Sequence, residues 1–205
     1  MFSVHNLSCI RDDRILFKNL NFELTAGQVL QIEGRNGCGK TSLLRILCGL
    51  LFQETGEVRW QGQNIEDVRS EYQAELSYIG HAHGVKAELT PQENLTVARA
   101  LSEKPTDKPL DEILALLGLR GFEDVASATL SAGQRRRVAL ARLLAIQSRL
   151  WILDEPFTAL DKVGIKNVEA MLDQHAKAGG IAILTSHHTV ICDHATVMQL
   201  DDYRP

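Results

Sequence analysis

The sequence contains no apolar run long enough to cross a membrane. Its longest apolar stretches, residues 42–51 and 138–146, are interrupted by Arg45 and Arg142. Both fall well short of the roughly 18 residues that a membrane-spanning helix needs. The N-terminus also lacks the basic segment followed by an apolar segment that marks a secretory signal. We therefore expect a protein that stays in the cytoplasm.

Cysteine and positive charge are also scarce. The four cysteines, Cys9, Cys38, Cys48 and Cys192, show no CxxC spacing. We interpret them as free thiols of a reducing compartment, and the spacing disfavours a structural zinc site. The 22 Lys and Arg residues are outnumbered by 26 Asp and Glu residues, which gives a formal net charge of −4. This balance disfavours a generally basic nucleic-acid binder.

The patterns that are present indicate an α/β protein. The 205 residues, of which 44% are hydrophobic, suffice for one large domain or for one domain with a small insert. Strands are expected within residues 1–33, 150–153 and 181–184, and helices over 41–48 and 163–178. Such an alternation of strands and helices predicts a parallel sheet covered by helices.

The middle of the chain, roughly residues 81–145, has the character of a helical insert. Thr90 and Glu93 have the spacing of a capping box, with a proline at the first helical position. Ser131 and Gln134 have the same spacing at the start of a later helix. The sequence therefore predicts that this insert is helical and interrupts the alternating α/β pattern.

The strongest single signal lies in residues 34–41. They fit the pattern G-x-x-x-x-G-K-[ST], with an expected strand before them and an expected helix after them. Glycines let backbone N–H groups turn towards phosphate oxygens, Lys40 is placed to reach the β- and γ-phosphates, and Thr41 to ligate Mg²⁺. A plain glycine turn would leave the Lys-Thr register unexplained, so we expect a phosphate-binding loop.

Two carboxylates follow the apolar strand at 150–153. Asp154 ends the strand, where a carboxylate is expected to approach Mg²⁺. Glu155 is then expected beside the γ-phosphate, where it polarises the attacking water as a general base. The alternative, two acids that cap a strand in solvent, is disfavoured once the phosphate loop is granted.

A third motif, Leu-Ser-Ala-Gly-Gln at residues 130–134, gives a small-residue helix N-terminus that suits a phosphate. With this motif the chain resembles the ABC-transporter ATPase family, in which it reads LSGGQ, so that Ala132 departs from it. The resemblance implies a P-loop NTPase fold of the RecA-like type over residues 1–205. In that fold a parallel core carries an N-terminal antiparallel β subdomain and an inserted helical subdomain.

The resemblance also implies the roles of individual residues. Glu155 and His187 would be catalytic, with His188 as a competing candidate for the switch histidine. ATP would be held by Gly34, Asn36, Gly37, Cys38, Gly39, Lys40, Thr41, Ser42, Ser131, Gly133, Gln134 and Asp161, and Mg²⁺ by Thr41, Asp154 and His81. Ser131, Gly133 and Gln134 would act on the nucleotide of a second copy, so that two chains enclose two ATP molecules.

Two positions depart from the family pattern. His81 stands where the family normally has a glutamine, and an imidazole cannot reproduce the paired donor and acceptor of an amide. Arg11 stands near the place where the family stacks an aromatic ring on adenine, and a guanidinium plane is able to stack on a base.

Within the family, the chain looks most similar to ATP-binding subunits of haem exporters in cytochrome c maturation. The segments that carry this likeness are 31–34, 56–63, 79–81, 121–124 and 151–159. The resemblance implies a peripheral protein on the cytoplasmic face of the bacterial inner membrane, bound to integral membrane subunits of the CcmB and CcmC type and to no nucleic acid. ATP hydrolysis would then drive haem export or the release of a haem-loaded chaperone.

Several alternatives remain at this stage. The chain could serve an ABC transporter for another substrate, a soluble ABC ATPase without a transport role, or a P-loop kinase, which has no use for residues 130–134. The arginines at 135–137 are interpreted as a solvated helix face, with phosphate steering as the alternative. Metal or haem ligation by His81 and His83, or by His187 and His188, is disfavoured.

Overall fold

A parallel sheet forms the centre of the molecule in the computed structural model, which describes residues 1–82 and 84–204. Its strands lie in the order β6 (Leu76–Ile79), β7 (Leu150–Asp154), β8 (Ile181–Thr185), β3 (Val29–Glu33) and β9 (Ala195–Gln199). Each neighbouring pair is parallel. The carboxyl ends of these strands therefore share one edge of the sheet, where α/β proteins bind their ligands.

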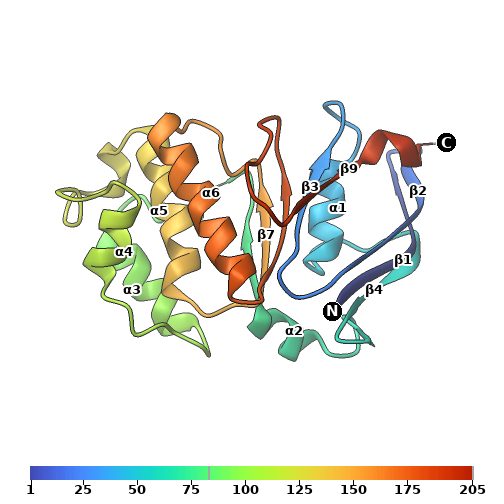
Figure 1. The fold of residues 1–205 in the computed structure, drawn as a ribbon, viewed down its shortest axis with the longest axis horizontal. Coiled ribbons are helices and arrows are strands. Elements are labelled where there is room, and N and C mark those ends of the chain that lie inside the picture. Colours follow the sequence, from blue (N-terminus) through green and yellow to red (C-terminus); the bar gives the residue numbers. More distant parts are fainter. Residues whose placement is uncertain (83, 205) are drawn as a thin grey trace.

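An antiparallel sheet lies beside the parallel one. Its strands have the order β2 (Arg14–Leu24), β1 (Phe2–Arg11), β4 (Thr55–Trp60) and β5 (Gln63–Asn64). Helix α1 (Lys40–Leu47) lies between the two sheets (Figure 1) and buries Leu43, Leu44, Ile46 and Leu47. These leucines and isoleucine share one hydrophobic core with side chains of both sheets, so α1 connects the two sheets.

The remaining helices pack mainly on the other face of the parallel sheet. They are α3 (Pro91–Leu101), α4 (Leu110–Leu116), α5 (Ala132–Ala145) and α6 (Lys162–Lys177), with a short helical turn η1 (Ser127–Thr129) before α5. Figure 1 shows them gathered at the end of the molecule away from both chain termini. Helix α2 (Arg69–Glu75) precedes β6, and the turn η2 (Leu200–Tyr203) ends the described chain. No described helix is long and apolar enough to cross a membrane.

Strand β7 shows how the parallel sheet separates two cores. Leu150 and Ile152 pack into the core shared with α1, whereas Trp151 and Leu153 pack into the core shared with α3 to α6. All four side chains are at most 4% exposed. A strand buried on both faces has no polar alternation, which explains the continuous apolar run in the sequence.

Both predicted capping boxes are present. At the start of α3, Glu93 N donates to Thr90 Oγ1 (3.2 Å) and Thr90 N donates to Glu93 Oε2 (2.8 Å). Ser131 and Gln134 make the same pair of bonds at the start of α5. Local backbone chemistry thus sets where these helices begin.

The interpretation of residues 135–137 as a solvated face is wrong. Arg136 is 1% exposed, Arg137 pairs with Asp161, and Arg135 donates to the carbonyl of Leu130. The acceptors of Arg136 are backbone carbonyls of residues 80, 154 and 156. The residue pattern along one helix does not reveal that two distant loops supply these carbonyls. Their hydrogen bonds make burial of the Arg136 charge tolerable.

His175 is partly buried at the amino-terminal edge of the parallel sheet. Its ring stacks on Trp151 with centroids 3.8 Å apart and planes 9° from parallel, and its Nε2 lies 3.2 Å from the carbonyl oxygen of Ile181. Burial lowers the pKa of His175 to about 4. The folded protein therefore holds this imidazole neutral.

This burial predicts a loss of stability in mild acid. Between the unfolded pKa of 6.5 and the folded pKa of about 4, the unfolded chain binds more protons, so stability falls as pH falls through that window. We expect His175 to contribute about 2 kcal/mol to this loss between pH 7 and pH 5, and urea denaturation at the two pH values measures it. His175→Gln removes the titrating group and should lose correspondingly less over the same pH step. Equal losses in both proteins would contradict the assignment.

Candidate functional site

A pocket of about 480 Å³ opens at the carboxyl edge of the parallel sheet. The loops that follow β3, β6, β7 and β8 all contribute to it. Its lining residues are Leu16, Asn36, Gly37, Gly39, Lys40, Thr41, Ser42, His81, Asp154, Glu155, Thr158 and His187. Residues predicted from four separate motifs are therefore brought to one place by the parallel strand order.

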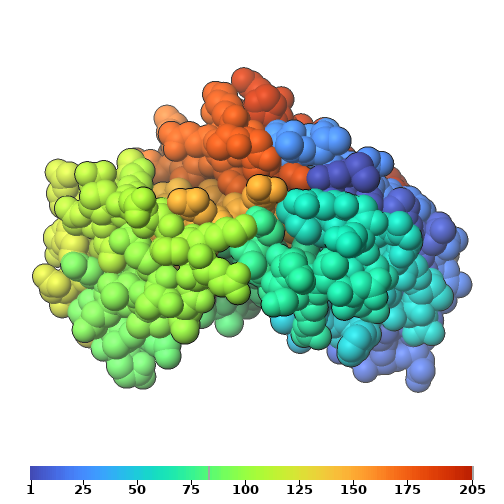
Figure 2. Space-filling model, turned by 90° about the horizontal axis from the view of Figure 1, so that it is seen from below, coloured from blue at the N-terminus to red at the C-terminus, as the bar shows by residue number. Residues whose placement is uncertain are grey.

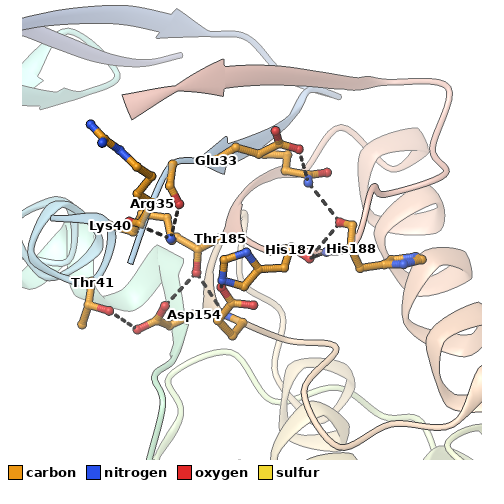
Figure 3. A network of polar contacts seen from close by, with 12 residues as sticks. Glu33, Arg35, Lys40, Thr41, Asp154, Thr185, His187 and His188 are labelled. Carbon is orange, nitrogen blue, oxygen red and sulfur yellow. Dashed lines mark hydrogen bonds and ion pairs between the residues drawn. The ribbon is translucent and has the colours of Figure 1, made fainter. Parts of the chain in front are cut away.

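The phosphate-loop residues connect β3 to α1 along one wall of this pocket. Gly37 and Gly39 have φ of 77° and 109°, which side chains disfavour. A Cβ on Gly39 would also lie 3.0 Å from the Cβ of Leu16. Lys40 Nζ donates to the carbonyl of Gly34 (2.6 Å), and Figure 3 shows Lys40 beside Arg35. The first backbone N–H groups of α1 lie at the pocket wall, where the helix dipole favours a bound anion.

Two predicted phosphate-loop residues hold the loop rather than line the pocket. Cys38 is buried, and a Cβ on Gly34 would approach its Sγ to 2.7 Å. Behind them, Asp201 Oδ2 of η2 accepts from Arg35 N (2.8 Å). This bond, together with the Arg35 side chain, lowers the pKa of Asp201. The C-terminal turn therefore braces the start of the loop, a contact that the motif did not reveal.

Asp154 lies at the centre of the site (Figure 3) and is 3% exposed. Its Oδ2 accepts from Thr41 Oγ1 of α1 (2.8 Å) and its Oδ1 accepts from Thr185 Oγ1 of β8 (2.7 Å). Thr185 Oγ1 in turn accepts from Glu155 N (3.0 Å). Asp154 thus joins three segments of the pocket wall. Thr185 was not predicted, because a single threonine at the end of a buried strand carries no sequence signal.

Glu155 turns its carboxylate into the pocket. Its φ of 51° lies in the left-handed region, so the chain reverses sharply at the end of β7. Its side chain is 23% exposed, and Oε1 lies 3.6 Å from Nε2 of His187, which is 65% exposed. A carboxylate and an imidazole that share a pocket in this way can orient a water molecule and accept its proton.

The two candidate switch histidines point in different directions (Figure 3). His187 lines the pocket. His188 turns to α6, where Nε2 lies 3.1 Å from Glu169 Oε1. Buried Gln31 fixes the loop between them and β9, because it donates to the carbonyl of His188 and accepts from Val190 N, both at 3.0 Å. The geometry therefore favours His187 as the residue that meets a ligand.

The two departures from the family pattern have different outcomes. His81 lines the pocket, as its position after β6 predicts. Arg11 pairs with Arg14 at the β1–β2 turn, and among the described residues it is Leu16 and Thr158 that line the pocket instead. His83 lies outside the described residues, and those residues contain no group of three or more side chains suited to holding a metal.

Ser131, Gly133 and Gln134 are not part of the pocket lining in the described chain. They form the N-terminus of α5, and a Cβ on Gly133 would approach the carbonyl oxygen of Ala159 to 2.5 Å. Asp161 caps α6 through Gly164 N (2.7 Å) and pairs with Arg137 (2.6 Å). The bond from Gly164 N lowers the pKa of Asp161. A single chain thus separates these four predicted ligands from the phosphate loop.

Comparison with known proteins gives consistent results. A family model described as "ABC transporter" matches residues 17–158. The chain is 50% identical over 197 residues to the cytochrome c biogenesis ATP-binding export protein CcmA of Nitrosococcus oceani, which covers 96% of this chain and 90% of that protein. It is 55% identical over 185 residues to the protein of the same name from Methylococcus capsulatus, which covers 90% and 89%.

Solved structures show the same fold. A putative ABC transporter ATP-binding protein from Pyrococcus furiosus is similar with a TM-score of 0.86 at 22% identity, over 100% of this chain and 99% of that one.

The Thr185 hydroxyl offers a test of the network around Asp154. Thr185→Val keeps the shape of the side chain but leaves Asp154 Oδ1 and the Glu155 amide without this partner. Because both groups are at the pocket wall, we expect a loss of about 1–3 kcal/mol in the free energy of unfolding. Thr185→Ser keeps the hydroxyl and should lose clearly less. Similar losses for the two variants in urea denaturation would show that the methyl group, not the hydroxyl, matters.

Proposed function

Because this chain belongs to the ABC transporter family and so binds and hydrolyses ATP, we propose that it is the ATP-hydrolysing subunit of a haem-handling export complex. Its action would be haem export or the release of a haem-loaded chaperone in c-type cytochrome maturation. The relatives named for cytochrome c biogenesis and export are 50–55% identical over at least 90% of the chain. The observation that carries the catalytic part is the pocket in which Glu155 and His187 face the phosphate loop.

ATP binds with its phosphates along the loop of residues 34–42. Lys40 leaves the carbonyl of Gly34 to meet the β- and γ-phosphates, because a bound anion offers stronger charge-assisted bonds. Asn36, Gly37, Gly39 and Ser42 border the same space. Leu16 gives the pocket an apolar surface, which we propose lies against the base in place of the aromatic ring that the family uses.

Thr41 and Asp154 suit a Mg²⁺ ion. Their hydroxyl and carboxylate oxygens lie 2.8 Å apart at the pocket wall, and Mg²⁺ prefers oxygen ligands. Bound there, the ion would neutralise charge on the phosphate oxygens. His81 lies at the same pocket, where its imidazole would sense the ion through a water molecule, since a nitrogen ligand suits Mg²⁺ poorly.

Hydrolysis uses Glu155 as the general base. Its carboxylate accepts a proton from the attacking water, and the hydrogen bond that Glu155 N donates to Thr185 Oγ1 keeps the residue in place at the carboxyl end of β7. His187, 3.6 Å away, donates a hydrogen bond towards the γ-phosphate. Together these groups orient water for in-line attack.

A second copy of the chain completes the site. Ser131, Gly133 and Gln134 form a capped helix N-terminus outside the pocket of their own chain. The N–H groups and the dipole at a helix N-terminus attract a phosphate. We propose that this turn meets the γ-phosphate held by the other copy, and that Asp161, after the turn that contacts Gly133, lies at the same interface.

The helical subdomain, about residues 81–145, transmits the motion to membrane partners of the CcmB and CcmC type. A groove of about 370 Å³ runs between α2 and the end of α3, on the face that Figure 2 shows hollowed between the green and teal lobes. Leu101 is 82% exposed and lines this groove together with Leu76 and Ala98, so it offers an apolar side chain to a partner. We propose that a cytoplasmic loop of an integral subunit binds here, at the bacterial inner membrane.

The base assignment predicts the behaviour of Glu155→Gln. Without a carboxylate, kcat for ATP hydrolysis should fall at least about 100-fold. ATP affinity and ATP-dependent dimer formation, followed by gel filtration, should be retained or strengthened. Glu112→Gln changes an exposed carboxylate on α4 and serves as the matched control. Hydrolysis by Glu155→Gln at the wild-type rate would rule out this base.

The membrane assignment predicts which proteins remain bound to the chain. A tagged chain extracted from membranes in mild detergent should retain integral subunits of the CcmB and CcmC type. Leu101→Glu should abolish this retention at unchanged ATP affinity, because it replaces an apolar side chain that lines the groove with a charged one. Leu116→Glu, at an exposed leucine of α4, should not. Recovery of the wild-type chain only in the soluble fraction would contradict the export assignment. Capture of other integral subunits would indicate a transporter for a different substrate.

A further inference from the structure

Arg136 is the largest fully buried side chain of the described protein. It extends from the first half of α5, two residues after Gln134. A positive charge at 1% exposure is costly unless other groups satisfy its N–H donors. The groups that bind the guanidinium must therefore explain why this charge is buried here.

The partners are backbone carbonyls of two catalytic loops. Nη2 donates to the carbonyl of Asp154 (2.7 Å) and Nε to that of Pro156 (3.3 Å), so the guanidinium holds the peptide just before Glu155 and the peptide just after Pro156. Nη1 donates to the carbonyl of Gly80 (3.1 Å), the residue that precedes His81. One side chain thus joins the turn that carries Glu155 to the loop that carries His81.

The Glu155 turn depends on such restraints, to which the bond from Glu155 N to Thr185 Oγ1 also contributes. Glu155 lies at a φ of 51°, and a left-handed conformation at a residue with a side chain persists only where its surroundings impose it. Bonds to the carbonyls of residues 154 and 156 hold the backbone before Glu155 and after Pro156, and so restrain the turn at both of its ends. The planar fork of a guanidinium reaches three acceptors at once, which a lysine ammonium on a flexible stem does not reproduce.

Charge adds to the geometry. Burial lowers the pKa of Arg136, whereas the nearby carboxylates of Asp154 and Glu155 raise it. The guanidinium remains cationic at neutral pH because arginine begins from a very high pKa. It therefore also opposes the accumulation of negative charge at the carboxyl end of β7.

We propose that Arg136 is a positioning residue for hydrolysis, which locks the Glu155 turn and the His81 loop into one arrangement. The proposal rests on the proposed function, because it takes Glu155 as the base and His81 as a sensor of the bound nucleotide. Movement of α5 or of the helical subdomain then reaches Glu155 through this side chain. The same helix carries Ser131 and Gln134 at its start. When two copies of the chain close around ATP, the movement of α5 therefore reaches Glu155 through Arg136.

The test compares Arg136→Lys with the wild-type chain in steady-state ATP hydrolysis. Lysine keeps the charge and loses the fork, so kcat should fall at least about tenfold while KM for ATP changes less than about twofold. Arg120→Lys, at an exposed arginine, is the matched control and should change neither quantity. Wild-type kcat in a folded Arg136→Lys protein would overturn the proposal without touching the assignment of Glu155, which Glu155→Gln tests separately.

A double-mutant cycle with His81→Ala tests the connection between the two loops. If Arg136 joins them, the kcat losses of His81→Ala and Arg136→Lys should be clearly non-additive. Additive losses would leave Arg136 as a structural residue and overturn the proposal. If Arg136→Lys does not fold, the Nε–H NMR resonance of Arg136 in the wild-type chain replaces it. That resonance should shift when a non-hydrolysable ATP analogue binds, and should shift less in His81→Ala. An unchanged resonance would overturn the proposal.

Discussion

The buried carboxylate of Asp154 is the interaction on which the rest of the site depends. It ends β7 at the centre of the parallel sheet and binds the hydroxyls of Thr41 and Thr185 through its two oxygens. One bond fixes the start of α1 behind the phosphate loop, and the other fixes the end of β8, two residues before His187. A carboxylate at this depth is tolerated because both oxygens have partners. The same oxygens are those that the proposed Mg²⁺ would share, so folding and metal binding would then use one group.

Much of the fold and of the pocket could be predicted from the sequence, because the motifs are local. The phosphate loop, the Asp154–Glu155 pair and the two capping boxes each lie within a few consecutive residues, and each predicts a backbone geometry. Arg136, Thr185 and Asp201 could not be found in this way. Their partners lie on other strands and loops, so their roles depend on tertiary contacts that no periodicity records. Leu16 was missed for the same reason, since only the approach of β2 to Gly39 brings it to the pocket.

The separation of the two halves of the proposed ATP site follows from the same topology. The carboxyl edge of the parallel sheet collects the loops after β3, β6, β7 and β8. The residues at 131–134 instead begin a helix that packs on the far core, so their position depends on how that helical layer lies against the sheet. A site divided in this way is able to respond to movement between the two layers. A site built on one sheet edge alone would have no such response.

Loops at the carboxyl ends of parallel strands leave the sheet ladder, and their backbone groups need other partners. In this protein, polar side chains from rigid elements supply them. Gln31 of β3 holds the loop after His187, Asp201 of η2 holds the start of the phosphate loop, and Arg136 of α5 holds the Glu155 turn. Each is a side chain bonded to backbone, so each specifies a loop conformation rather than a contact between side chains. A buried charge in such a position is explained by the geometry it imposes, because burial alone would favour an apolar residue there.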